Sequence, residues 1–187
     1  DALNITESNL KMTNTEFKNI SSDAFDSDFS KVVINNVRFA SINGDAIDTS
    51  GSNVKIRNVI TYNVGDKSLS AGEGSIVEAQ KIEFTNSRIG IATKDSSEVI
   101  INECKILNSS VADIISYRKK HLYSYGKIFL KNSEIDSEKV FYENQNAIKF
   151  EDKKFILQKL KNFKLIKKKK YPNFFDNYIQ SMKKNEI

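Results

Sequence analysis

The sequence predicts an all-β fold, a parallel β-helix of about six coils, and two observations lead to this prediction. The first is a repeat of about 22 residues, in which each unit opens with a serine at Ser8, Ser30, Ser52, Ser75 and Ser97. The second is that apolar residues within a unit lie two positions apart, as Val54 and Ile56 do. This is the period of a β-strand and not of a helix. Short units of this kind stack so that every strand pairs with its copy in the next coil.

Two apolar columns in phase with the repeat predict the core. One contains Leu3, Phe25, Ile47, Leu69, Ile91 and Ile114, and the other contains Phe17, Phe39, Thr61, Phe84, Ile106 and Ile135. Each apolar member stabilises the fold by roughly 1.5–3 kcal/mol when it is fully buried. A polar column, with Asn14, Asn36, Asn58 and Asn132 and with Lys81 and Glu103 in between, predicts a ladder of side-chain amides at a tight turn.

Composition limits the class of protein. The chain has 187 residues, of which 39% are hydrophobic and 28% charged, as in a folded domain. No apolar run approaches the roughly 18 residues that a transmembrane segment needs. Cys104 and His121 are each the single residue of their type, which excludes a disulfide framework and a zinc site of His and Cys ligands. We predict no metal site of this kind.

The charge divides the chain into two parts. The net charge is +5, but residues 151–187 contain eleven Lys and four acids, so that segment carries +7 and residues 1–150 carry −2. We therefore expect a β-helix over residues 1–150 and a basic, partly helical C-terminal cap over residues 151–187. A helix from Asn173 to Met182 with an apolar stripe would cover the open end of the solenoid. The alternative is attachment to an anionic surface through Lys167–Lys170.

The first residues are already in phase with the repeat. Asp1-Ala2-Leu3 matches Asp23-Ala24-Phe25, so the chain begins inside a coil. We expect it to be the C-terminal part of a larger protein, whose N-terminal remainder would be a partner.

The segment from Gly44 to Asn58, Gly-Asp-Ala-Ile-Asp-Thr-Ser-Gly-Ser-Asn-Val-Lys-Ile-Arg-Asn, has a strand–turn–strand–Asn pattern. It resembles the pectate-lyase-like right-handed parallel β-helices, and the likeness extends from Asp1 to about Ile135. The resemblance implies a right-handed coil and a glycan held on the face of the first strand. It implies no particular activity, because lyases, hydrolases, epimerases, tailspikes and non-catalytic modules share the fold. Residues 65–73 and 90–95 also resemble, more weakly, β-helix modules attached to spore-coat-kinase-like proteins.

Residues beside the core column are expected to point outward. One such column is Ala24, Ala46, Ser68, Gly90 and Asp113, and the next is Asp26, Asp48, Ser70, Ala92 and Ile115. Their small side chains predict a flat or grooved face for a ligand, or for packing against another surface. Asp26 and Asp48 are candidate ligand-binding residues. With Asp28 they can share a calcium ion, or they are simply solvated.

A charged cluster follows at the next turn and supplies candidate catalytic residues. Glu73 and Asp95 are one coil apart, near the roughly 5 Å separation of a retaining glycosidase pair. Lys94 and Arg118 can neutralise a uronate carboxylate or take its α-proton. The alternative is a ladder of salt bridges between coils.

One coil is longer than the others. Val99 and Ile128 are 29 residues apart, and the insert carries aromatic and basic residues, namely Tyr117, Arg118, Lys119, Lys120, His121, Tyr123 and Tyr125. Aromatic rings with basic groups suit stacking on sugar rings and contact with acidic substituents, and they also suit nucleic-acid backbones. The alternative is that the tyrosines pack on the body. We choose Tyr117, Arg118, Lys119, Tyr123 and Tyr125 as ligand-binding candidates.

The function that we predict is a carbohydrate-facing module that binds or organises a cell-surface or capsule-like polysaccharide, outside the cytoplasm. The alternatives are a polysaccharide lyase or glycoside hydrolase, and a structural spacer that forms homo-oligomers. We expect no cofactor apart from calcium. Nucleic acid is not an expected partner, because the body is acidic and only the insert and the C-terminal segment are basic.

Overall fold

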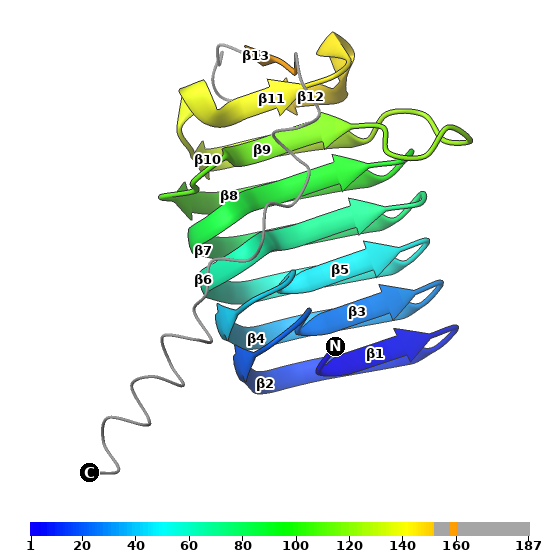
Figure 1. The fold of residues 1–187 in the computed structure, drawn as a ribbon. Helices are drawn as coiled ribbons and strands as arrows, with labels where there is room; N and C mark the ends of the chain where they lie inside the picture. The colour runs from blue at the N-terminus through cyan, green and yellow to red at the C-terminus, as the bar shows by residue number, and fades with distance from the viewer. Residues whose placement is uncertain (152–157, 161–187) are drawn as a thin grey trace.

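The computed structural model describes residues 1–151 and 158–160, in which thirteen strands and two short 3₁₀ helices form a β-solenoid (Figure 1). The strands are β1 Leu3–Thr6, β2 Asn9–Ile20, β3 Phe25–Asp28, β4 Lys31–Ile42, β5 Ile47–Ser50, β6 Asn53–Gly72, β7 Ile76–Lys94, β8 Glu98–Leu107, β9 Ala112–Tyr117, β10 Lys127–Glu134, β11 Val140–Tyr142, β12 Ile148–Phe150 and β13 Gln158–Lys159. The 3₁₀ helices are η1 Ser137–Lys139 and η2 Gln145–Ala147. Within the described residues, no helix has the length and apolar character needed to cross a membrane.

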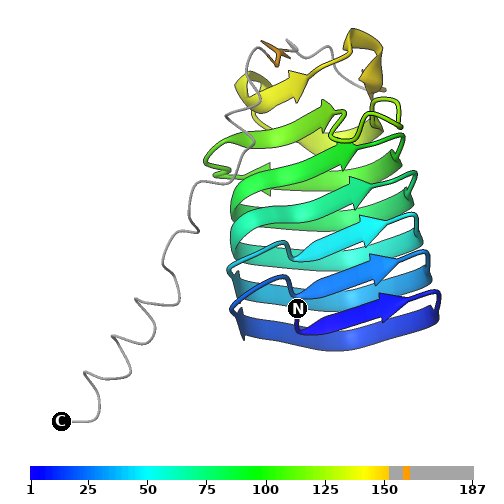
Figure 2. The same ribbon diagram turned by 45° about the vertical axis from the view of Figure 1, so that its right-hand side comes forward.

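Every strand pairing is parallel and joins a strand to the next coil. The predicted all-β parallel solenoid is therefore confirmed, and Figure 2 shows the coils stacked with little change in orientation. There are about seven turns where the sequence predicted six, because β11 and β12 form a further coil within the predicted range 1–150, after the last residue assigned to a core column, Ile135. The predicted C-terminal helix from Asn173 to Met182 and Lys167–Lys170 lie outside the described residues.

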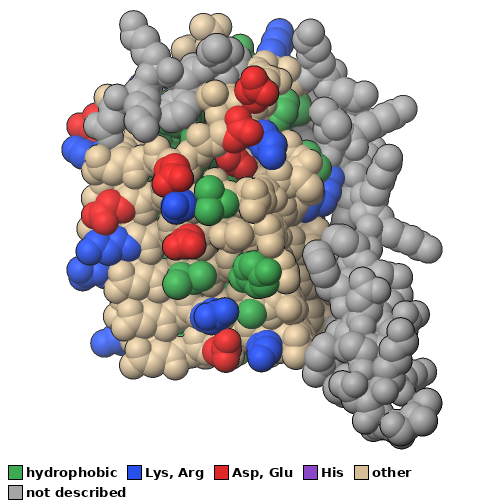
Figure 3. Space-filling model, turned by 90° about the vertical axis from the view of Figure 1, so that its left-hand side faces the viewer, with side chains coloured by type: hydrophobic (Ala, Val, Ile, Leu, Met, Phe, Trp, Pro, Cys, Tyr) green, Lys and Arg blue, Asp and Glu red, His purple; other side chains and the backbone are tan. Residues whose placement is uncertain are grey.

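The solenoid has three lateral faces, separated by columns of residues with left-handed backbone. Face 1 consists of β1, β3, β5, residues 67–72, residues 89–94, β9 and β11. Face 2 consists of residues 9–13, 31–35, 53–57, 76–80, 98–102, 127–131 and β12. Face 3 consists of residues 15–18, 37–40, 59–62, 82–85, 104–107 and 133–134. Figure 3 shows one lateral face, on which hydrophobic side chains form only small patches among charges of both signs.

Asparagines occupy two of the left-handed columns. The predicted amide ladder forms between faces 2 and 3, where Asn36 Nδ2 donates to Asn14 Oδ1 at 3.3 Å and Asn58 Nδ2 donates to Asn36 Oδ1 at 3.0 Å. Asparagine suits these positions because it tolerates positive φ better than most residues. The sequence analysis missed a second column, which lies after face 3 and contains Asn19, Ser41, Asn63, Asn86 and Asn108.

The repeat serines form a ladder of their own. The Ser52 hydroxyl accepts a hydrogen bond from the Ser30 backbone N–H at 3.0 Å, and the Ser75 hydroxyl accepts one from the Ser52 N–H at 3.1 Å. Ser30 and Ser97 make the same bond to Ser8 and Ser75. The serine therefore satisfies a turn N–H that no strand partner reaches, which explains why this position recurs in the sequence.

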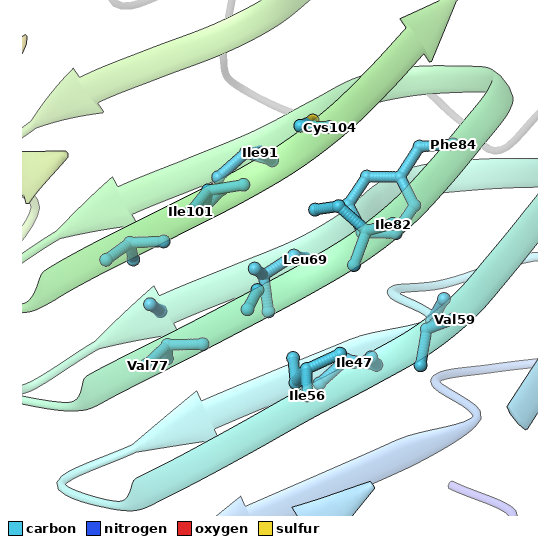
Figure 4. Close-up of a cluster of buried hydrophobic side chains, with 14 of the residues drawn as sticks. Ile47, Ile56, Val59, Leu69, Val77, Ile82, Phe84, Ile91, Ile101 and Cys104 are labelled. Atoms are coloured by element: carbon cyan, nitrogen blue, oxygen red, sulfur yellow. The ribbon is translucent and has the colours of Figure 1, made fainter. Parts of the chain in front are cut away.

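The core columns point inward as predicted, and Figure 4 shows Ile47, Leu69 and Ile91 stacked one above another. Phe17 and Phe39 stack with ring centroids 5.0 Å apart. Thr61, the polar exception in this column, is fully buried, and its hydroxyl lies 2.7 Å from the equally buried Ser68 hydroxyl. Each hydroxyl thus supplies the hydrogen-bond partner that the other needs inside the core.

We predicted that the column containing Ala24, beside Phe25, points outward, and this prediction is wrong. Ala24 and Ala46 are fully buried in the main core, and Ser68 contacts Thr61 there. Asp113 is buried too, and its Oδ2 accepts the Asp136 N–H at 2.7 Å. The chain bends as it enters face 1, so strict alternation of side chains does not yet hold at these residues and two successive residues face the interior.

Candidate functional site

The insert forms a loop that leaves the solenoid after β9 and returns at β10 (Figures 1 and 2). Val99 pairs with Ile128 in regular register, so the extra residues 118–126 are accommodated without disturbing the stacking of the coils. The loop lies at the corner between faces 1 and 2, beside the turn that contains Asp95 and Ser96.

Several hydrogen bonds fix this loop to the body. Asp95 Oδ1 accepts the backbone N–H groups of Lys119 and Lys120, each at 2.7 Å. Ser96 N–H donates to the Ser124 carbonyl at 2.9 Å, and Ser124 N–H donates to the Ser96 hydroxyl at 2.8 Å. The loop is therefore held in one shape before any ligand binds, which lowers the entropy cost of binding.

The outer surface of the loop is cationic and aromatic. Arg118, Lys119 and Lys120 are exposed, and the Arg118 guanidinium lies over the Tyr125 ring at 5.4 Å from its centroid. Tyr123 and Tyr125 are half-buried, so each ring keeps an accessible part. Glu73 balances part of this charge because it pairs with Lys120, and the Glu143 carboxylate accepts the backbone N–H of Arg118 at 2.7 Å.

Tyr117 has a different position from the rest of the predicted binding set. Its side chain is only 5% exposed and packs in a second apolar cluster with Ile89, Ala92, Ile115 and Leu160. Burial raises the pKa of the Tyr117 hydroxyl to about 12. The ring therefore supports the base of the loop and presents no face to a ligand.

The four candidate catalytic residues lie near one another, but the protein itself engages the side chains of three of them. Asp95 is fully buried and holds the loop, and Glu73 is bound to Lys120. Lys94 is 6% exposed, with Nζ 2.7 Å from the Ser70 hydroxyl and 3.7 Å from Asp48 Oδ1. Arg118 alone of the four reaches solvent freely. Catalysis by this set stays a prediction.

Asp26 and Asp48 stack on the outer side of face 1, one coil apart. Asp26 accepts a hydrogen bond from Asn4 Nδ2 at 3.1 Å. Burial, together with the negative charges of Asp48 and Asp28, raises the pKa of Asp26 to about 6. Among the described residues, no three His, Cys, Asp or Glu side chains converge as metal ligands. The shared calcium ion therefore stays a prediction that this geometry does not support.

The sequence analysis missed a buried network of charges at the start of face 1. Lys67 Nζ lies 3.1 Å from Asp45 Oδ1 and 2.7 Å from Asp66 Oδ2, and Arg88 Nη1 lies 2.9 Å from Asp66 Oδ1. Asp66 has two cations, and its pKa is lowered because they outweigh its burial. Among the described residues, Lys67 is the one cation paired with Asp45, so burial prevails and raises the pKa of Asp45 to about 7. The Gly-Asp pairs at residues 44–45 and 65–66, together with the spacing of 22 residues between Asp45 and Lys67, were the visible signal.

A comparison with protein families agrees with this architecture. The model of the right-handed β-helix region matches residues 1–158. The chain belongs to the right-handed β-helix family. Membership confirms the handedness that the resemblance implied, and a β-helix of this family is consistent with a carbohydrate-related or a structural module. No curated protein matches the chain significantly, so the pectate-lyase-like likeness contributes the fold and no particular activity.

Proposed function

We propose that this β-helix binds an acidic polysaccharide through the loop of residues 118–126 and the adjoining corner of the solenoid. The observation that carries the proposal is the Arg118 guanidinium stacked over Tyr125 on an exposed loop that hydrogen bonds hold in place. The loop contains three permanent cations and no acidic residue.

This arrangement suits a chain of uronate sugars. The partly exposed rings of Tyr123 and Tyr125 offer apolar surface for the faces of sugar rings, while Arg118 and Lys119 supply donors for carboxylates. A neutral glycan would use only the rings and would therefore bind more weakly. The solenoid itself supplies a rigid support, as scaffolds with functional loops commonly do.

The test is direct binding by calorimetry of a hexauronate, with a neutral hexaglucan and a short thymidine oligomer as comparison probes. We expect the hexauronate alone to bind measurably, with an affinity that falls as salt rises. Replacing both Arg118 and Tyr125 by Ala should remove about 2–4 kcal/mol of binding free energy, which is roughly a 30-fold loss or more.

Arg38→Ala is the matched control, because Arg38 is an exposed arginine on face 3 that pairs with Glu16 at 3.5 Å. It removes one charge away from the loop and should leave binding unchanged. The proposal fails if the loop variant binds the hexauronate like the wild type, or if the thymidine oligomer binds better than the sugar. Melting curves of all variants should agree within a few degrees, because surface substitutions seldom change stability by more than about 0.5 kcal/mol.

A further inference from the structure

Face 2 has an outward column in which basic, apolar and acidic side chains follow one another in a particular order along the solenoid axis. From the first coil to the sixth, the column reads Lys11, Val33, Lys55, Glu78, Ile100 and Phe129. Val33 is 40% exposed and Ile100 is 44% exposed. They line the two ends of a shallow groove of about 490 Å³, with Lys55 and Glu78 between them.

The first six members of this column are complementary to their own reverse, and Lys149 of the seventh coil lies beyond the matched stretch. When the order of the coils is inverted, Lys55 stands opposite Glu78 and Val33 stands opposite Ile100. One pair of the neighbouring column of face 2 is complementary too, because Lys31 of the second coil stands opposite Glu98 of the fifth.

We propose that face 2 is a homodimer interface, in which two copies pack face to face with their solenoid axes antiparallel. The two-fold axis runs parallel to the strands and passes between the third and fourth coils. Each dimer then contains two Lys55–Glu78 contacts, two Lys31–Glu98 contacts and two Val33–Ile100 contacts. A parallel arrangement would instead place each residue of the middle column opposite its own copy, with Lys55 against Lys55 and Glu78 against Glu78, and like charges disfavour it.

Face 3 shows that such self-complementarity is not a general property of this solenoid. Its outward column reads Glu16, Arg38, Ile60, Glu83, Lys105 and Glu134. Inverting the order places Arg38 opposite Lys105 and Glu16 opposite Glu134, which are repulsive pairs. The antiparallel arrangement therefore brings complementary residues together on face 2 and like charges together on face 3.

The area of face 2 determines how strongly two copies are expected to associate. Six coils at about 4.8 Å and five residues at about 3.3 Å give a contact area of roughly 500 Å² per copy. This lies at the low end for specific interfaces, so the dimer should be weak and dependent on concentration. We expect sedimentation velocity to show a monomer at about 5 µM and a dimer at about 500 µM.

Charge reversal provides the sharp test. Lys55→Glu and Glu78→Lys should each dimerise at least tenfold more weakly, because each variant places like charges opposite one another. A mixture of the two variants should recover association. In the mixed dimer, the new carboxylate of the first variant meets the new ammonium group of the second, and the unchanged Glu78 of the first meets the unchanged Lys55 of the second. A wild-type protein that stays monomeric at the highest concentration, or single variants that dimerise like the wild type, would overturn the proposal.

The antiparallel orientation is tested by cross-linking. Val33→Cys and Ile100→Cys proteins, mixed under mild oxidation, should form a disulfide-linked heterodimer, whereas neither variant should link to itself. Self-linking of either variant would show the parallel arrangement and contradict the proposal. Cys104 should not interfere, because it is buried and burial raises the pKa of its thiol above the usual range. The matched control is Arg38→Cys on face 3, which should give no dimer.

Discussion

Lys67→Met tests whether the buried charges of face 1 depend on one another. Lys67 is 9% exposed, and its ammonium group bridges the carboxylates of Asp45 and Asp66. Methionine keeps most of the length and apolar surface of the lysine but removes the charge. Asp66 retains Arg88 at 2.9 Å, whereas Asp45 retains only the backbone N–H of residue 67 at 2.9 Å.

The expected loss of stability follows from the Asp45 carboxylate, which loses its cation in the variant. Breaking a buried ion pair by removal of one partner costs roughly 3–5 kcal/mol. For a chain of this size, such a loss lowers the melting temperature by roughly 6–20 °C. The loss should be greatest at pH 8, where Asp45 would be ionised, and smaller at pH 5, where it takes up a proton.

The sign of the pH effect follows from the raised pKa. In the wild type, the pKa of Asp45 is about 7 in the fold against 3.8 in the unfolded chain, so its contribution is fully present below pH 3.8 and is lost as pH rises through 7. Lys67 lowers the pKa of Asp45, so replacing Lys67 raises that pKa further. The stability of the variant should then fall more steeply than that of the wild type as pH rises. Urea unfolding at pH 5 and pH 8 measures both effects. The double variant with Asp45→Asn is the control and should recover most of the stability at pH 8. A loss below about 1 kcal/mol at pH 8, or an equal loss at both pH values, would refute the reasoning.

Two further predictions concern stability. Asp26→Asn should stabilise the protein by about 1 kcal/mol above pH 6 and by much less near pH 4, because burial raises the pKa of Asp26 to about 6, its contribution to stability is lost as pH rises through that value, and the side chain is partly exposed. Melting temperatures at pH 4 and pH 8 check this, and an equal shift at both would contradict it. Thr61→Val and Ser68→Ala should each cost about 1–3 kcal/mol, because each leaves the other hydroxyl buried without its partner. The double variant should cost less than the sum, and a strictly additive result in urea unfolding would show that the two hydroxyls do not depend on each other.

The repeat made the core and two sides of the coil predictable from sequence. Stacking places equivalent residues one above another, so Phe25, Ile47 and Leu69 had to share an environment once the period was known. The amide ladder through Asn36 followed from the same logic. The second asparagine column was equally visible at Asn63, Asn86 and Asn108, whose spacings of 23 and 22 match the repeat.

Residues that depend on departures from regularity were not predictable. Lys67 follows Asp45 by 22 residues, so the repeat already places the two residues one coil apart, but only the structure shows that both are buried where the chain bends into face 1. Simple alternation cannot anticipate this bend, and it also sent Ala46 and Ser68 to the wrong side. The insert was located correctly by its length, but the sequence could not show that Asp95 is used to hold it or that Tyr117 is buried beneath it.

The loop and the dimer together have a geometric consequence. Because the proposed two-fold axis runs along the strands, both loops lie on the same edge of the dimer, with the sixth coil of one copy beside the first coil of the other. The loops are then separated by five coil steps, or about 24 Å along the axis, a distance that a long glycan spans and a hexamer does not span while filling both sites. Polyuronate should therefore bind the wild type more tightly than Lys55→Glu above the dimerisation concentration, whereas a hexauronate should bind the two equally. Equal affinity of both proteins for the polymer would show that the two loops do not act together.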